Sequence, residues 1–105
     1  AARQVLGDLL KSPEAATVAE AAFAIGEAWE GEGDHPAAAE YYMTAAYVAA
    51  ESLAGRRALL GAAASLAALK QPDAAAIVYK KLLDQPGVPA DLAEAARKGL
   101  RELGR

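Results

Sequence analysis

Residues 19–47, AEAAFAIGEAWEGEGDHPAAAEYYMTAAY, decide the fold that the sequence predicts. In the first half, apolar residues such as Ile25 and Trp29 recur at the spacing of one helix face. The second half is rich in alanine, the residue with the highest helix propensity. Between the halves, Gly33 is suited to end one helix and Asp34 to cap the next. The stretch therefore predicts two helices joined by a short turn, which makes them antiparallel neighbours.

The same two-helix unit recurs along the chain. Leu6, Tyr42 and Tyr79 occupy equivalent positions in similar stretches, 36 and then 37 residues apart. Turns rich in Pro, Gly, Asp and Ser separate the alanine-rich segments. We therefore expect an all-α fold of antiparallel helix-turn-helix repeats, stacked as a short right-handed α-solenoid of about six helices. The expected helices lie near residues 2–11, 14–32, 36–51, 53–69, 72–84 and 90–103.

These helices are expected to form one domain over residues 1–105. Its predicted parts are the second helix of a truncated repeat at 1–12, repeats at 14–51 and 53–85, and a closing helix at 90–104. Besides Asp34, polar residues with N-cap character mark three further helix starts. We expect Ser12 to cap the helix that begins at Pro13, Ser52 the helix near Leu53, and Asp91 the last helix.

Composition narrows the function classes. Alanine makes up roughly three residues in ten, far above ordinary usage, and favours helices that approach closely. The net charge is −3, whereas a nucleic-acid-binding domain is expected to carry a basic patch. The chain has no cysteine, which excludes disulfides and zinc–thiolate sites. No stretch approaches the ~18 apolar residues of a membrane span. We therefore expect neither nucleic-acid binding nor a membrane span.

Residues 19–47 resemble a tetratricopeptide repeat. The residues that carry the resemblance fill that family's small, aromatic and turn positions in register: Ile25, Gly26, Trp29, Gly33, Asp34, Ala38, Tyr42 and Ala45. The next period matches less fully, with Leu82 in place of the family's alanine. The resemblance implies that Gly26 and Ala38 are the close-contact points of the helix pair, with Trp29 and Tyr42 filling the space around them.

The long period is similar to that of one group within the family. Repeats of 36–37 residues with a Ser-Pro or Gln-Pro before an alanine-rich helix resemble those of bacterial envelope proteins. The resemblance implies a location in the periplasm or cell envelope of a bacterium, with the bacterial cytoplasm as the alternative.

The polar residues give no basis for catalysis. His35 is the only histidine, so it lacks the second ligand that a metal site needs, and we interpret it as an exposed turn residue. Ser12 and Ser52 are interpreted as helix caps, and Ser65 has no histidine near it in sequence, so no catalytic triad is indicated. We therefore expect no enzyme activity, no catalytic residue, no cofactor and no metal.

The resemblance does imply a partner-binding groove. In tetratricopeptide repeats, the first helix of each pair lines a concave face that binds a protein or peptide. The corresponding positions here are Glu20, Phe23, Glu27, Glu30, Arg57, Leu60, Glu94, Arg97 and Arg101. We expect a groove that is acidic and carries an exposed Phe23 at one end, and is basic at the other. The alternative is that these charges only keep the surface soluble.

A protein-binding scaffold module is therefore the expected function. The alternative is a structural or self-associating helical module, the C-terminal end piece of a longer repeat protein. In that case Leu6, Leu9 and Leu10 of the first helix form an apolar flank that contacts the rest of the protein or a second copy, giving a homo-oligomer.

Overall fold

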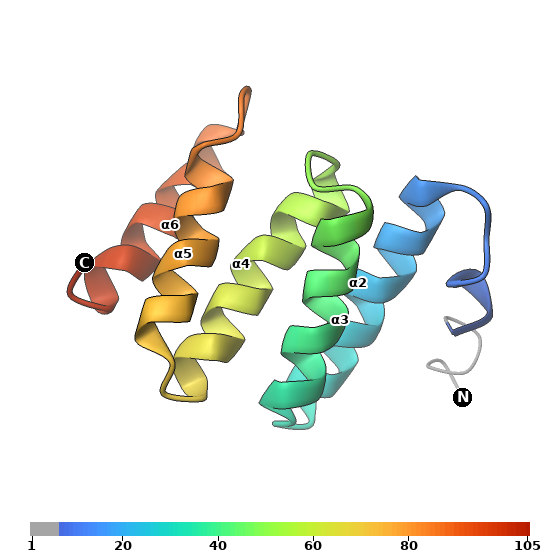
Figure 1. The fold of residues 1–105 in the computed structure, drawn as a ribbon, viewed down its shortest axis with the longest axis horizontal. Coiled ribbons are helices and arrows are strands. Elements are labelled where there is room, and N and C mark those ends of the chain that lie inside the picture. Colours follow the sequence, from blue (N-terminus) through green and yellow to red (C-terminus); the bar gives the residue numbers. More distant parts are fainter. Residues whose placement is uncertain (1–6) are drawn as a thin grey trace.

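The computed structural model describes residues 7–105, and within that range every regular element is an α-helix. The helices are α2 (Ala15–Gly31), α3 (His35–Val48), α4 (Leu53–Ala68), α5 (Pro72–Leu83) and α6 (Ala90–Glu102) (Figure 1). Residues 7–9 are also helical. The rest of the helix expected at 2–11, and with it Leu6, lies outside the described residues. The all-α prediction is confirmed.

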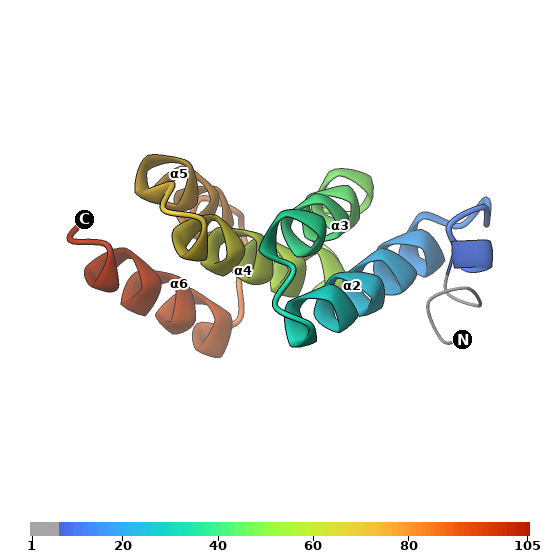
Figure 2. The same ribbon diagram turned by 90° about the horizontal axis from the view of Figure 1, so that it is seen from below.

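The helices lie in two layers. Each helix from α2 to α6 packs against the next one in the chain, and α4 also packs against both α2 and α6. Figure 2 shows α3 and α5 on one side of the molecule, with α2, α4 and α6 forming the opposite layer. No Cα atom of α3 lies within 8 Å of a Cα atom of α5. One layer is therefore closely packed, whereas the two helices of the other layer are splayed apart.

Small side chains allow the helices to approach closely. Most buried residues are alanines, including Ala38, Ala45 and Ala62, each with no exposed surface. Among the largest fully buried side chains are Tyr42 and Leu82. Alanines together with a few large side chains can fill the narrow space between close helices. The core is therefore built from alanine contacts, with a few large side chains placed between them.

Tyr42 lies between two glycines on neighbouring helices. A Cβ atom added to Gly26 on α2 would lie 2.7 Å from its ring, and one added to Gly61 on α4 would lie 2.6 Å from it. Tyr79 has a similar neighbour on α6, where a Cβ on Gly99 would lie 2.2 Å from the ring. Carbon atoms are normally at least about 3.5 Å apart. Each tyrosine ring therefore occupies space that exists only because these glycines lack a side chain.

Two of the predicted caps are confirmed. The Asp34 carboxylate accepts a hydrogen bond from the Ala37 amide at 3.1 Å, and the Ser52 hydroxyl accepts one from the Gly55 amide at 3.0 Å. The turn before α3 also contains Gly33 with a φ of +78°, a conformation that glycine adopts without strain. Both connections therefore follow the local rules from which they were predicted.

The caps predicted for Ser12 and Asp91 are wrong. α2 starts at Ala15 with Glu14 at the N-cap, and the Ser12 hydroxyl instead accepts a hydrogen bond from the Glu14 amide. Pro89 is the N-cap of α6 and places Asp91 in the first turn, where a carboxylate is favoured by the helix dipole. In both segments, proline allows the chain to bend one or two residues away from the predicted boundary.

Two further expectations need correction. α3 ends at Val48 rather than at residue 51, because the Ser52 hydroxyl donates to the Ala49 carbonyl at 2.7 Å as the chain turns into α4. His35 is not an exposed turn residue but the half-buried first residue of α3. Its Nδ1 atom is buried and has no hydrogen-bond partner among residues 7–105.

The N-terminal apolar flank is also smaller than expected. Leu9 is 42% exposed, but Leu10 is partly buried against the core.

None of the helices in residues 7–105 is long and apolar enough to cross a membrane.

Candidate functional site

A hollow of about 250 Å³ lies between α2 and the start of α4. Glu20 and Phe23 line it from α2, and Leu53, Ala54 and Arg57 line it from α4. Glu20 and Phe23 lie on one side of α2 because they are three residues apart. Leu53 and Arg57 lie on one side of α4 because they are four residues apart. The hollow therefore has an apolar floor with one acidic and one basic side chain at its edge.

The position of Phe23 differs from the expectation of an exposed aromatic. The side chain is half-buried, and its ring packs against Tyr42 with the centroids 5.7 Å apart and the planes tilted by 41°. Tilted arrangements of this kind are favourable for aromatic pairs. Phe23 therefore presents only part of its ring to the hollow, and its orientation is fixed by the core beneath it.

The two charged residues of this hollow are available for binding. Glu20 and Arg57 are both exposed, and neither forms an ion pair with another residue in the range 7–105. The planar guanidinium of arginine binds carboxylates through paired hydrogen bonds, and a carboxylate accepts from lysine or arginine. The rim of this hollow therefore offers one anchor for each sign of charge.

A second hollow of about 280 Å³ is lined by Glu27, Glu30, Gly31 and Tyr42. The Tyr42 hydroxyl donates a hydrogen bond to the Glu30 carboxylate. Burial of the ring, and after it this hydrogen bond, raise the pKa of Tyr42 above its usual value. Glu30 is therefore engaged within the protein, whereas the exposed Glu27 provides acidic surface beside it.

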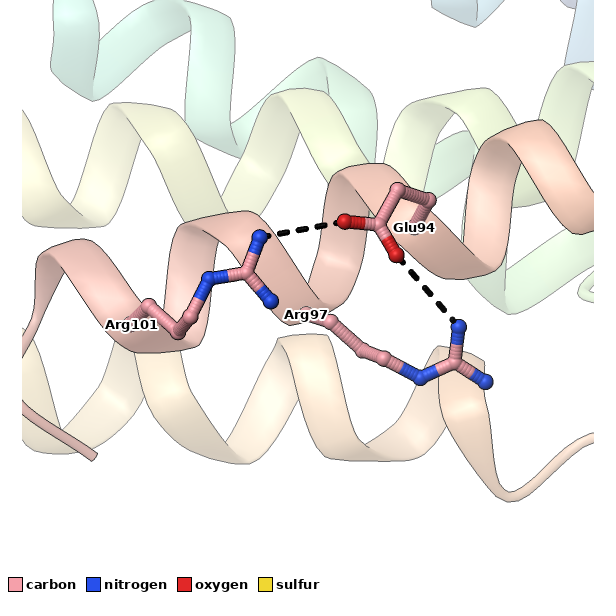
Figure 3. Close-up of polar contacts among 3 residues, drawn as sticks. All are labelled: Glu94, Arg97 and Arg101. Atoms are coloured by element: carbon pink, nitrogen blue, oxygen red, sulfur yellow. Dashed lines mark hydrogen bonds and ion pairs between the residues drawn. The ribbon is translucent and has the colours of Figure 1, made fainter.

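The charged residues predicted on the last helix form an ion-paired group (Figure 3). The Glu94 carboxylate lies 3.0 Å from the Arg101 guanidinium and 3.7 Å from that of Arg97. The hydrogen bond from Arg101 is the main cause that lowers the pKa of Glu94. All three side chains are largely exposed. This end is therefore less basic than expected, because one carboxylate is shared by two guanidinium groups.

The predicted groove residues thus fall into separate groups. Glu20, Phe23 and Arg57 come together at one hollow, and Glu27 and Glu30 at another. Glu94, Arg97 and Arg101 form the ion-paired group on α6. Leu60 lines neither hollow and is partly buried against the core.

Sequence reasoning missed the residues that complete these sites. Leu53 lies one turn before Arg57, so helical spacing was a signal that could have placed it in the first hollow. No sequence signal indicated the role of Arg56, which is half-buried and anchors the loop after α5. Its guanidinium donates to the Gln85 side-chain oxygen at 2.9 Å and to the Pro86 carbonyl at 2.8 Å.

Residues 7–105 contain no group of three or more His, Asp or Glu side chains placed to hold a metal ion. Comparison of the chain with family models, with curated proteins and with solved structures finds no significant match.

Proposed function

We propose that this protein is a non-catalytic protein-binding module of the tetratricopeptide type, which binds a peptide segment of a partner across α2 and α4. The observation that carries the proposal is the hollow lined by Phe23, Leu53 and Ala54, with Glu20 and Arg57 at its rim. An apolar centre surrounded by charged groups is the usual composition of a protein-binding surface.

The chemistry of the hollow defines the kind of peptide. A bulky apolar side chain of the partner fills the space above Phe23, because aromatic rings held in place by packing are effective anchors. A carboxylate next to that side chain pairs with Arg57, and a lysine or arginine on its other side pairs with Glu20. The surface of Glu27 adds further acidic character along α2. The partner segment is therefore apolar at its centre and carries both signs of charge.

The test is a selection of displayed random peptides on the immobilised protein, followed by fluorescence anisotropy with the enriched peptide. Arg57→Glu is the informative variant, since Arg57 is exposed and its substitution leaves the core intact. Lys80→Glu is the matched control, because it makes the same change of charge at an exposed position of α5 in the other layer.

We expect enriched peptides to contain an apolar residue beside an acidic one. Arg57→Glu should weaken their binding about fivefold or more, since a favourable ion pair becomes a repulsion, while Lys80→Glu changes little. If both variants bind equally well, or if no peptide is enriched, the proposal is wrong.

A second candidate is self-association, which the exposure of Leu9 favours. Sedimentation equilibrium separates the two. A dimer that is lost in Leu9→Lys supports self-association, and a monomer at all concentrations rules it out.

The origin in a bacterium and the place in its envelope belong to the same proposal, since both follow from the resemblance of the repeat length.

A further inference from the structure

A different hollow, of about 330 Å³, lies between the two splayed helices α3 and α5. Met43 and Tyr47 line it from α3, and Lys81 and Gln85 line it from the end of α5 and the following loop. Most of its lining comes from α3, α5 and the segments that follow them, and α3 and α5 lie on the side of the molecule opposite to α2, α4 and α6 (Figure 2). It shares no lining residue with the hollow of Phe23 and Arg57, so the two are separate.

The hollow lies where α3 and α5 diverge. No Cα atom of α3 comes within 8 Å of a Cα atom of α5, and the buried Leu59 of α4 lines the space between them. The other residues of α3 that face this gap are small, such as Ala46.

Hydrogen bonds hold one end of the hollow in place. The Gln85 side-chain amide donates to the Ala50 carbonyl at 2.8 Å, which joins the end of α5 to the turn after α3. The Arg56 guanidinium donates to the oxygen of the same Gln85 side chain at 2.9 Å. A wall fixed in this way needs no ordering when a ligand binds, so less affinity is lost to conformational entropy.

Exposed apolar side chains line the hollow and continue beyond it along α5. Tyr47 is 91% exposed, Met43 also projects from α3, and Ile77 on α5 is 58% exposed. Ile77 lies one turn before Lys81, so it continues the same side of α5. Aromatic residues and methionine are enriched at protein interfaces. This combination indicates that the outer layer contacts another protein.

The charge of the lining indicates the partner's chemistry. Among the described residues that line the hollow, Lys81 is the charged one. It forms no ion pair with any residue between 7 and 105. We propose that this hollow binds an acidic segment of a partner protein, whose bulky apolar side chain enters between α3 and α5 while a neighbouring carboxylate pairs with Lys81. The interaction is independent of the α2–α4 surface.

The probe is a capped tripeptide with leucine between two glutamates, and it is titrated into the full chain. Binding is measured from the shifts of the backbone amide signals in two-dimensional NMR spectra. Two further tripeptides serve as controls, one with lysines in place of the glutamates and one with alanine in place of leucine. We expect the first probe to shift the amides of Ala46, Tyr47 and Lys81, and the two controls to bind more weakly.

Charge-reversal variants make the test specific. Lys81→Glu should weaken binding of the acidic probe about fivefold or more, whereas Lys80→Glu, its exposed neighbour on α5, retains the wild-type affinity. Tyr47→Ala should also weaken binding, and its high exposure means that the fold is unaffected.

Three results would overturn the proposal. The first is an equal effect of Lys81→Glu and Lys80→Glu. The second is a set of shifts centred on Phe23 and Arg57, which would place the probe on the other surface. The third is a concentration-dependent dimer that Tyr47→Ala abolishes, which would make the occupant a second copy of this chain.

Discussion

Gly61 tests the packing of Tyr42 most directly, because glycine-to-alanine changes in helices have a known sign. In an ordinary helix interior, such a change stabilises the protein by up to about 1 kcal/mol, since alanine has the higher helix propensity. In α4 we expect the opposite. The new Cβ would lie 2.6 Å from Cε2 and 2.7 Å from Cζ of Tyr42.

The ring has no direction in which to retreat. Movement away from Gly61 takes it toward Gly26, where an added Cβ would lie only 2.7 Å from the ring. The hydroxyl at its tip is also bonded to Glu30. Overpacking of a core costs typically about 1–3 kcal/mol. After a gain in helix propensity of about 1 kcal/mol is subtracted, Gly61→Ala should destabilise the protein by up to about 2 kcal/mol.

The measurement is urea unfolding followed by far-UV circular dichroism. Gly31→Ala is the control, because nothing lies within 4 Å of its added Cβ, and it should stabilise by about 0.5 kcal/mol. The double variant Gly26→Ala/Gly61→Ala should lose more than the sum of the single losses, because both changes compress one ring. If Gly61→Ala raises the urea midpoint as Gly31→Ala does, Tyr42 does not pack against Gly61 as described.

Three further predictions concern other parts of the fold. Arg56→Ala should lower the free energy of unfolding by about 1–3 kcal/mol in the same urea assay, since it removes the hydrogen bonds to the loop after α5. The control is Arg57→Ala at the exposed neighbouring position, which should change the free energy of unfolding little. Ser65→Ala should stabilise by about 1 kcal/mol, because Ser65 is 2% exposed and its buried hydroxyl has no hydrogen-bond partner within residues 7–105. A lower urea midpoint would show that the hydroxyl has a partner. Burial raises the pKa of both Tyr42 and Tyr79. The free energy of unfolding should therefore fall as the pH rises above about 10, because the tyrosines of the unfolded chain ionise first. Urea midpoints measured at pH 8–11 should fall less steeply in Tyr42→Phe than in the wild type.

Local sequence signals predicted much of the fold. The starts of α3 and α4 follow from Asp34 and Ser52, whose side chains cap the helices as expected. The cap predicted for Ser12 was wrong because its hydroxyl accepts a hydrogen bond from the amide two residues ahead, which forms a turn instead of a cap. Near prolines, competing local hydrogen bonds of similar strength decide the boundary, and sequence pattern alone does not rank them.

The candidate site was predicted less completely. Helical spacing placed Glu20 and Phe23 on one side of α2, and the structure brings Arg57 of α4 to them. The degree of exposure of Phe23 depends on Tyr42, which comes from another helix, and the pairing of Arg97 and Arg101 depends on side-chain conformation on α6. The hollow between α3 and α5 depends on how far apart these two helices lie, which no residue in either one encodes.

The packing of Tyr42 and Tyr79 against glycines has a consequence for how the chain unfolds. Tyr42 of α3 and Tyr79 of α5 each contact a glycine of the following helix, Gly61 and Gly99. Separation of α6 therefore uncovers Tyr79 but leaves Tyr42 covered on both sides. Unfolding that starts at the C-terminal end should advance by one helix pair at a time, with the amides of α3 and α4 the last to exchange their hydrogens with solvent.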